Sequence, residues 1–122
     1  MIKNAFHELV DLKDYFFRIE AASIRVEQPE EEVWTGYDKN MEGVYNLVEG
    51  VELDLDLKLG YSTEEFNAFC KAMDFQYNAG VGGQNLFGTI WFTDGTWATR
   101  EEYNGSEWWE HHTRPEIPVE LR

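Results

Sequence analysis

Hydrophobic and polar residues alternate with a period of two along several parts of the chain. Residues 51–59 show the clearest case, with valine and leucine alternating with glutamate, aspartate and lysine. Such alternation predicts a strand with one aliphatic face and one acidic face. Residues 15–27 alternate less regularly and are expected to form a strand or a pair of strands, although Glu20-Ala21-Ala22 would also suit a helix. Pro29 and the glutamates after it predict a loop at residues 28–32.

Residues 86–112 contain three aromatic and β-branched runs that predict a three-stranded antiparallel meander. The runs are separated by Asp94-Gly95 and Asn104-Gly105, the dipeptides that most favour tight hairpin turns. Two-residue turns would place Phe92 opposite Trp97 and Arg100 opposite Trp109. A longer loop at either turn would slip the register and exchange the two faces.

The two faces of this meander would both be aromatic. The face with Arg100 is expected to point outward, because an arginine there can stack on Trp109 and pair with acids. That face would also carry Phe87, Trp91, Glu102 and Glu107, and the opposite face would carry Ile90, Phe92, Trp97, Tyr103 and Trp108.

Three stretches carry apolar residues at helical spacing. Residues 4–13 and residues 38–49 each predict a short amphipathic helix. Ser62 starts a third helix through the capping-box pattern with Glu65. The tail at residues 114–118 is expected to lie extended against the sheet. These elements predict one α+β domain, residues 1–122, in which an antiparallel sheet with the C-terminal meander is covered on one face by two or three helices.

The charge balance is strongly acidic, with a net charge of −14 and a pI near 4.4. This argues against direct binding to nucleic acid or to anionic membranes, which requires a basic patch. The single Cys70 excludes an intramolecular disulfide and is typical of a reducing cytosol. The first ten residues show no signal-peptide pattern and no apolar run approaches the length of a membrane span, so a cytoplasmic protein is expected.

Several motifs resemble catalytic or ligand sites but favour structural interpretations. The glycines at residues 80–83 follow a helix and lack the lysine of a phosphate-binding loop. Adjacent His111 and His112 would point to opposite faces of a strand. Cys70 lies on an apolar helix stripe, where a cysteine is usually a core residue. We therefore expect no enzymatic activity, no metal and no cofactor.

The acidic residues allow two interpretations. They keep an aromatic-rich protein soluble, or their carboxylates imitate phosphates and occupy the basic groove of a nucleic-acid-binding protein. Alternate acids such as Asp54 and Asp56 lie roughly twice 3.3 Å apart along a strand, which matches the phosphate spacing of DNA loosely. The pairs Asp54/Asp56 and Glu101/Glu102 have no pocket signature that would favour a general acid and base.

The last third of the chain carries a more specific pattern. It reads Leu86-Phe-Gly-Thr-Ile-Trp-Phe-Thr-Asp-Gly-Thr-Trp, then Glu102-Tyr-Asn-Gly-Ser-Glu-Trp-Trp-Glu, then Arg114-Pro-Glu-Ile-Pro. This pattern resembles the C-terminal signature of a group of small acidic proteins of bacteriophages and prophages. The resemblance implies a phage-derived accessory protein, in a setting where small acidic proteins often act against host restriction, CRISPR and other nucleic-acid-handling enzymes. It transfers no catalytic residue.

Two main function hypotheses follow from these observations. The first is a phage-encoded inhibitor or modulator, of anti-CRISPR, anti-restriction or DNA-mimic type, that binds a nucleic-acid-binding host protein in the bacterial cytosol. Its partner-binding residues would be the anchors Trp91, Arg100 and Trp109 and the acids Asp54, Asp56, Glu101, Glu102, Glu107 and Glu110. The alternative is a phage structural or assembly protein whose aromatic face forms a homo-oligomer interface. An enzyme that uses clustered carboxylates and a metal ranks last.

Overall fold

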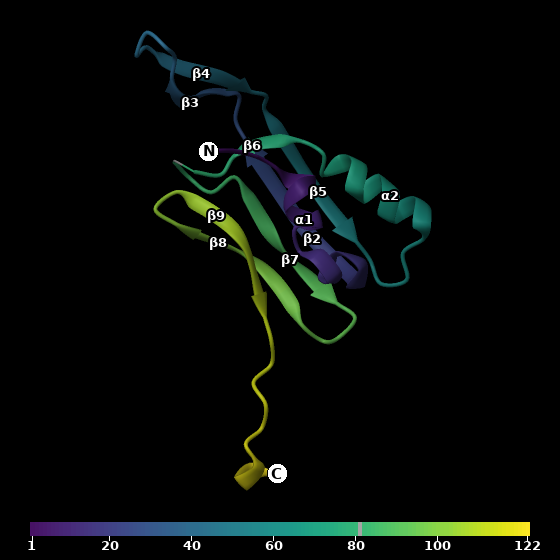
Figure 1. Cartoon of the computed structure of the whole chain (residues 1–122). Helices are drawn as coiled ribbons and strands as arrows, with labels where there is room; N and C mark the ends of the chain where they lie inside the picture. The colour runs from purple at the N-terminus through teal and green to yellow at the C-terminus, as the bar shows by residue number, and fades with distance from the viewer. Residues whose placement is uncertain (81) are drawn as a thin grey trace.

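The computed structural model describes residues 1–80 and 82–122 and shows a mixed α+β fold with mostly antiparallel sheets. The main sheet has five strands in the order β5-β2-β7-β8-β9, and all its neighbouring pairs are antiparallel (Figure 1). The strands are β2 (Ile19–Gln28), β5 (Val51–Leu57), β7 (Leu86–Phe92), β8 (Trp97–Tyr103) and β9 (Ser106–His112). The alternating pattern at residues 51–59 therefore does form a strand.

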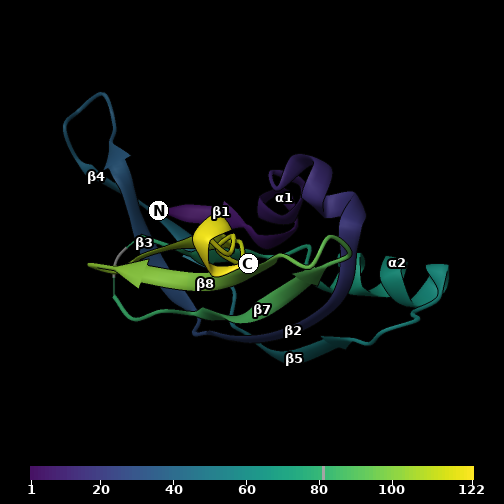
Figure 2. The same cartoon turned by 90° about the horizontal axis from the view of Figure 1, so that it is seen from below.

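One face of the main sheet, called the inner face here, is covered. Strand β1 (Ile2–Asn4) pairs with β6 (Gln76–Asn78), and β1 and helix α1 (Ala5–Val10) lie on the same side of the sheet in Figure 2. A 3₁₀ turn, Lys13–Arg18, leads into β2, so only the later part of the stretch at residues 15–27 is extended. Helix α2 (Thr63–Ala72) begins at the predicted capping box, because Ser62 Oγ accepts from Glu65 N at 3.1 Å.

The hydrophobic core lies under the inner face and draws on most elements of the fold. The central strands β2 and β7 contribute alternate residues, since alternate side chains point to the same face, whereas β5 contributes Leu57 and β8 contributes Ala98. The buried hydrophobic residues of this core are Ala5, Leu9, Ile19, Ala22, Ile24, Val26, Leu57, Phe69, Met73, Tyr77, Ala79, Leu86, Ile90, Phe92 and Ala98.

The predicted helix at residues 38–49 is wrong, because this segment forms most of a β-hairpin. Strands β3 (Glu31–Tyr37) and β4 (Gly43–Val48) pair only with each other among the described residues. At the tip, Asp38 Oδ1 accepts hydrogen bonds from Asn40 N at 2.7 Å and Glu42 N at 3.0 Å, and Met41 has a positive φ of 61°. These hydrogen bonds and the positive φ of Met41 form a tight turn, which is incompatible with a continuous helix at residues 38–49. The predicted loop at residues 28–32 is wrong in part, because β3 already starts at Glu31.

The two turns of the C-terminal strands differ, and one of them was mispredicted. Asn104 and Gly105 both have positive φ, 52° and 85°, as a two-residue hairpin turn requires, and Arg100 lies opposite Trp109 as expected. Between β7 and β8 only Gly95 has a positive φ, 86°, and Phe92 N donates to Thr96 O, which leaves a three-residue loop. The predicted pair of Phe92 and Trp97 is therefore wrong.

The longer loop slips the register of β7 against β8 by one residue. Trp91 now lies opposite Trp97, and Ile90 lies opposite Ala98. Trp97 consequently shares a face with Trp91, whereas Arg100 shares the buried face of Ile90. The expectation that Arg100 faces outward is corrected by this register.

The C-terminal tail also departs from expectation. Residues 113–122 are exposed and, after β9, lead away from the sheet to a short 3₁₀ turn, Val119–Leu121 (Figure 1). The predicted packing of the tail against the sheet is not observed.

Candidate functional site

The face of the main sheet opposite α1 and β1, called the outer face here, has no described helix or strand packed against it (Figure 2). Its side chains are the half of the alternation in each strand that does not enter the core, so they are exposed or half-buried. By register the outer face carries Ala21, Ser23, Arg25, Glu27, Glu52, Asp54, Asp56, Phe87, Thr89, Trp91, Trp97, Thr99, Glu101, Tyr103, Trp108, Glu110 and His112. The register therefore brings acidic and aromatic side chains of five strands onto one surface.

Among the described strand residues of the outer face, Arg25 is the only arginine or lysine, and its neighbours partly neutralise it. In the register, Arg25 lies between Asp54 on β5 and Phe87 on β7. Its guanidinium carbon is 4.8 Å from the centroid of the Phe87 ring, and its Nε is 3.6 Å from Glu27 Oε1. A hollow of about 490 Å³ opens beside these residues and is also lined by Asp56. The acidic residues of the outer face outnumber its single arginine. They are Glu27, Glu52, Asp54, Asp56, Glu101 and Glu110.

The β7–β8–β9 end of the outer face is aromatic. Trp91, with 45% of its surface exposed, lies beside Trp97. The His112 ring stacks on Trp97 with 5.7 Å between centroids, and its Nε2 lies 2.7 Å from Thr99 Oγ1. Trp108 Nε1 donates to Glu110 Oε2 at 2.9 Å. These contacts hold large rings at the surface with their apolar parts accessible.

The outer face unites five of the nine predicted partner-binding residues. These are Asp54, Asp56, Trp91, Glu101 and Glu110. The other four lie elsewhere. Glu102 is exposed at the end of β8, where its Oε1 accepts from Gly105 N at 2.7 Å and closes the turn. Arg100, Glu107 and Trp109 lie on the inner face.

Arg100 and Glu107 form a buried ion pair. Arg100 Nη2 donates at 2.8 Å both to Glu107 Oε1 and to the hydroxyl oxygen of Tyr77, and the two charged side chains are 1% and 0% exposed. Glu8 lies 3.7 Å from Arg100 Nη1 and accepts a hydrogen bond from the Tyr77 hydroxyl. Burial raises the pKa of Tyr77 well above its usual range, so the hydroxyl stays protonated.

Glu107 also binds the backbone. Its Oε2 accepts from Asn85 N at 2.8 Å, and its Oε1 accepts from Leu86 N at 3.0 Å. The Arg100 guanidinium carbon is 5.1 Å from the centroid of the Trp109 ring. This network connects five elements, α1, β6, β7, β8 and β9. Arg100 and Glu107 therefore have a structural role: they stabilise the packing of these elements.

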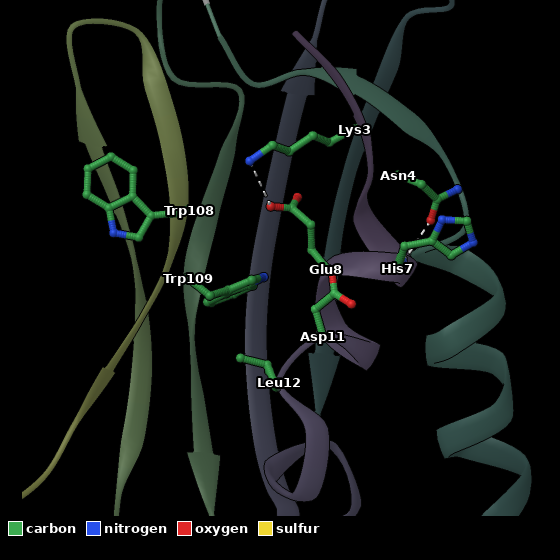
Figure 3. A pocket seen from close by; sticks show the side chains of 8 residues that line it. All are labelled: Lys3, Asn4, His7, Glu8, Asp11, Leu12, Trp108 and Trp109. Atoms are coloured by element: carbon green, nitrogen blue, oxygen red, sulfur yellow. Dashed lines mark hydrogen bonds and ion pairs between the residues drawn. The ribbon is translucent and has the colours of Figure 1, made fainter.

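A pocket of about 410 Å³ lies between α1 and β9 (Figure 3). Glu8 and Trp109 face each other across it, and Lys3 Nζ lies 3.9 Å from Glu8 Oε2. Trp109 Nε1 is buried and has no hydrogen-bond partner among the described residues. The pocket is lined by Lys3, Asn4, His7, Glu8, Asp11, Leu12, Trp108 and Trp109.

No described group of side chains has the geometry of a metal site. Among residues 1–80 and 82–122, no three His, Cys, Asp or Glu residues lie close enough to hold a metal ion. His111 turns to the inner face, where its ring is 4.1 Å from that of Tyr15, while His112 turns to the outer face. Cys70 is half-buried against the core, and burial raises the pKa of its thiol. The glycine-rich stretch at residues 80–83, discussed above as a possible phosphate-binding loop, includes Val81, which lies outside the described residues.

Several outer-face residues were not in the predicted set. Glu27 and Arg25 were missed although Ala22, Ile24 and Val26 mark the buried half of β2, which is the signal that would have placed them. Trp97 and Trp108 were assigned to the opposite face from Trp91 because of the one-residue slip.

Comparison of the chain with known proteins finds no match among protein-family models, curated proteins or solved structures. No helix among the described residues has the length and apolar character needed to cross a membrane.

Proposed function

We propose that the chain is a phage-encoded acidic binding protein that inhibits or modulates a nucleic-acid-handling protein of the bacterial host. The observation that carries this proposal is the outer face, an uncovered sheet surface that carries acids together with the exposed Trp91 and the half-buried Trp97 and Trp108. A partner that normally holds nucleic acid presents a basic groove, which attracts such a surface electrostatically. The resemblance of the last third of the chain to small acidic phage proteins supports the same context.

On the outer face, acidic and aromatic side chains would have different roles in binding such a partner. Acids at both margins, Asp54 and Asp56 on β5 and Glu101 and Glu110 on β8 and β9, would steer a cationic partner and replace phosphates. Trp91 would be the anchor, since a large aromatic side chain supplies most binding energy when it becomes buried at an interface. No chemistry by the protein itself is needed.

The test is an affinity pull-down from bacterial host lysate with the tagged protein. Beads are washed at about 0.1 M and then about 1 M salt, between which the Debye length falls from about 10 Å to about 3 Å. The outer-face variant combines Asp54→Asn, Asp56→Asn, Glu101→Gln and Glu110→Gln. The control variant combines Asp11→Asn, Asp14→Asn, Glu64→Gln and Glu120→Gln, which removes the same charge from exposed positions elsewhere.

The expected result is a nucleic-acid-binding protein that the wild type and the control variant retain at low salt. The outer-face variant and the high-salt wash should both lose it, and Trp91→Ala should weaken its retention. Equal retention by both charge variants would refute the role of the outer face. Recovery of only a salt-resistant oligomer of the chain itself would favour a structural or assembly protein instead.

A further inference from the structure

The β3–β4 hairpin, residues 31–48, projects away from the main sheet and is called the arm here (Figures 1 and 2). One of its faces exposes four large apolar side chains. Trp34, Tyr37, Tyr45 and Leu47 are 50%, 64%, 59% and 57% exposed. Trp34 lies opposite Tyr45, and the Trp34 and Tyr37 rings are 5.4 Å apart. An isolated two-stranded hairpin is marginally stable in water, so an arm that exposes this much apolar surface is suited to a partner.

Strand β4 is an edge strand without charged residues or proline that would hinder pairing with another strand. Among the described residues it pairs only with β3, so its second edge forms no ladder with another strand. Its sequence, Gly-Val-Tyr-Asn-Leu-Val, has no charge and no proline. The outermost strand β5 of the main sheet, by contrast, carries Glu52, Asp54 and Asp56, and charges of this kind normally prevent pairing with another chain.

The charges around β4 favour one kind of partner strand over another. Asp38 and Glu42 lie at the tip of the arm, and Glu32 and Glu49 lie near its base. In the antiparallel register that pairs all of β4 with a second copy, Gly43 faces Val48. Glu42 of one copy would then lie opposite Glu49 of the other at both ends, which is destabilising. A strand with basic residues at its ends would form attractive pairs at the same places.

We propose that the second edge of β4 binds an extended segment of another protein, which adds to the arm as a third, antiparallel strand. The segment carries Lys or Arg at both ends, opposite Glu42 and Glu49, and presents apolar side chains to Tyr45 and Leu47. Main-chain hydrogen bonds supply affinity in this mode of recognition, and the side chains supply specificity. The arm is separate from the outer face, so this proposal holds whether or not the function proposed above is correct.

The test uses the full-length, ¹⁵N-labelled protein and three synthetic peptides with blocked ends. The probe is Lys-Thr-Val-Thr-Val-Thr-Thr-Lys, whose eight residues span Glu42 to Glu49 and place valines opposite Tyr45 and Leu47. The first control, Glu-Thr-Val-Thr-Val-Thr-Thr-Glu, reverses the terminal charges. The second, Lys-Thr-Pro-Thr-Pro-Thr-Thr-Lys, keeps the charges but loses backbone donors to a strand ladder. Amide shifts are followed during titration for the wild type and for a variant with both Glu42→Lys and Glu49→Lys.

The probe should shift amides of β4 first and should bind at least about fivefold more tightly than the acidic control. The proline control should leave β4 unshifted, and the double variant should prefer the acidic peptide. Equal shifts with the probe and the proline control would overturn the proposal, because binding would then be unspecific attraction to an acidic protein. Shifts of β4 that depend on protein concentration without peptide would also overturn it, in favour of a second copy as the occupant.

Discussion

Replacing Glu107 with glutamine tests whether the buried ion pair stabilises the inner face. The carboxylate accepts one hydrogen bond from Arg100 and two from the backbone amides of Asn85 and Leu86. Glutamine supplies one oxygen and an amino group that cannot accept, so at least one of these donors loses its partner. The change also removes the charge that faces Arg100, and the next carboxylate, Glu8, is 3.7 Å from Nη1.

The expected loss of stability is large because both charges are buried. Breaking a buried pair by removing one partner costs about 3–5 kcal/mol. For a chain of 122 residues this corresponds to a fall in Tm of about 12–20 °C. The free energy of unfolding would be measured by urea denaturation, and Tm by circular dichroism. Asp56→Asn, an exposed change of the same kind on the outer face, should stay within about 0.5 kcal/mol of wild type.

A double-mutant cycle separates the ion pair from the backbone contacts of Glu107. Arg100→Met combined with Glu107→Gln should lose less stability than the sum of the two single variants, because the single changes each leave a buried charge unpaired. A Glu107→Gln protein within about 1 kcal/mol of wild type would refute the assignment of this pair as a stabilising element.

Three further predictions concern local structure. A Cβ on Gly88 would lie 2.4 Å from the Ser23 carbonyl oxygen, so Gly88→Ala should lower the free energy of unfolding in urea by more than about 2 kcal/mol, while Gly83→Ala, at an open position, should leave it within about 0.5 kcal/mol. Ser62→Ala removes the α2 capping box and should cost about 1 kcal/mol in the same assay, and an unchanged midpoint would contradict the role of the cap. Hydrogen bonds from Thr96 lower the pKa of Asp94, so its stabilising effect is complete above its usual pKa and is lost as pH falls through the lowered value. Urea midpoints should therefore fall more for wild type than for Asp94→Asn between about pH 5 and about pH 2, and parallel curves would contradict this.

The types of residue in the candidate site could be predicted from the sequence, but the face of the sheet on which each residue lies could not. Trp91, Glu101 and Glu110 stand at alternating positions within strands that the sequence reveals, because a period of two depends on neighbours only. Which face they share depends on the loop at Gly95, where three residues in place of two reverse the outcome for Trp97 and Arg100. An Asp-Gly pair is compatible with both loop lengths, so the sequence does not choose between them.

In the arm, the sequence pattern predicted the wrong type of secondary structure. Met41, Val44, Tyr45 and Val48 have helical spacing, and a helix was predicted from it. Val44, Tyr45 and Val48 fit a strand once Trp34 lies opposite Tyr45, and Met41 belongs to the turn that Asp38 closes. Short apolar runs fit both periods, and the pairing partner decides between them.

The sequence by itself determined the features that rest on a few adjacent residues. These are the Ser62 capping box, the Asn104-Gly105 turn, the alternation of β5 and the net charge of −14. Only the tertiary structure decided which acids and tryptophans share the outer face, and that Arg100 and Glu107 are buried. The physical reason is that burial of a charge depends on distant partners. Tyr77 and Glu8 reach Arg100 from other elements, and no local pattern encodes that contact.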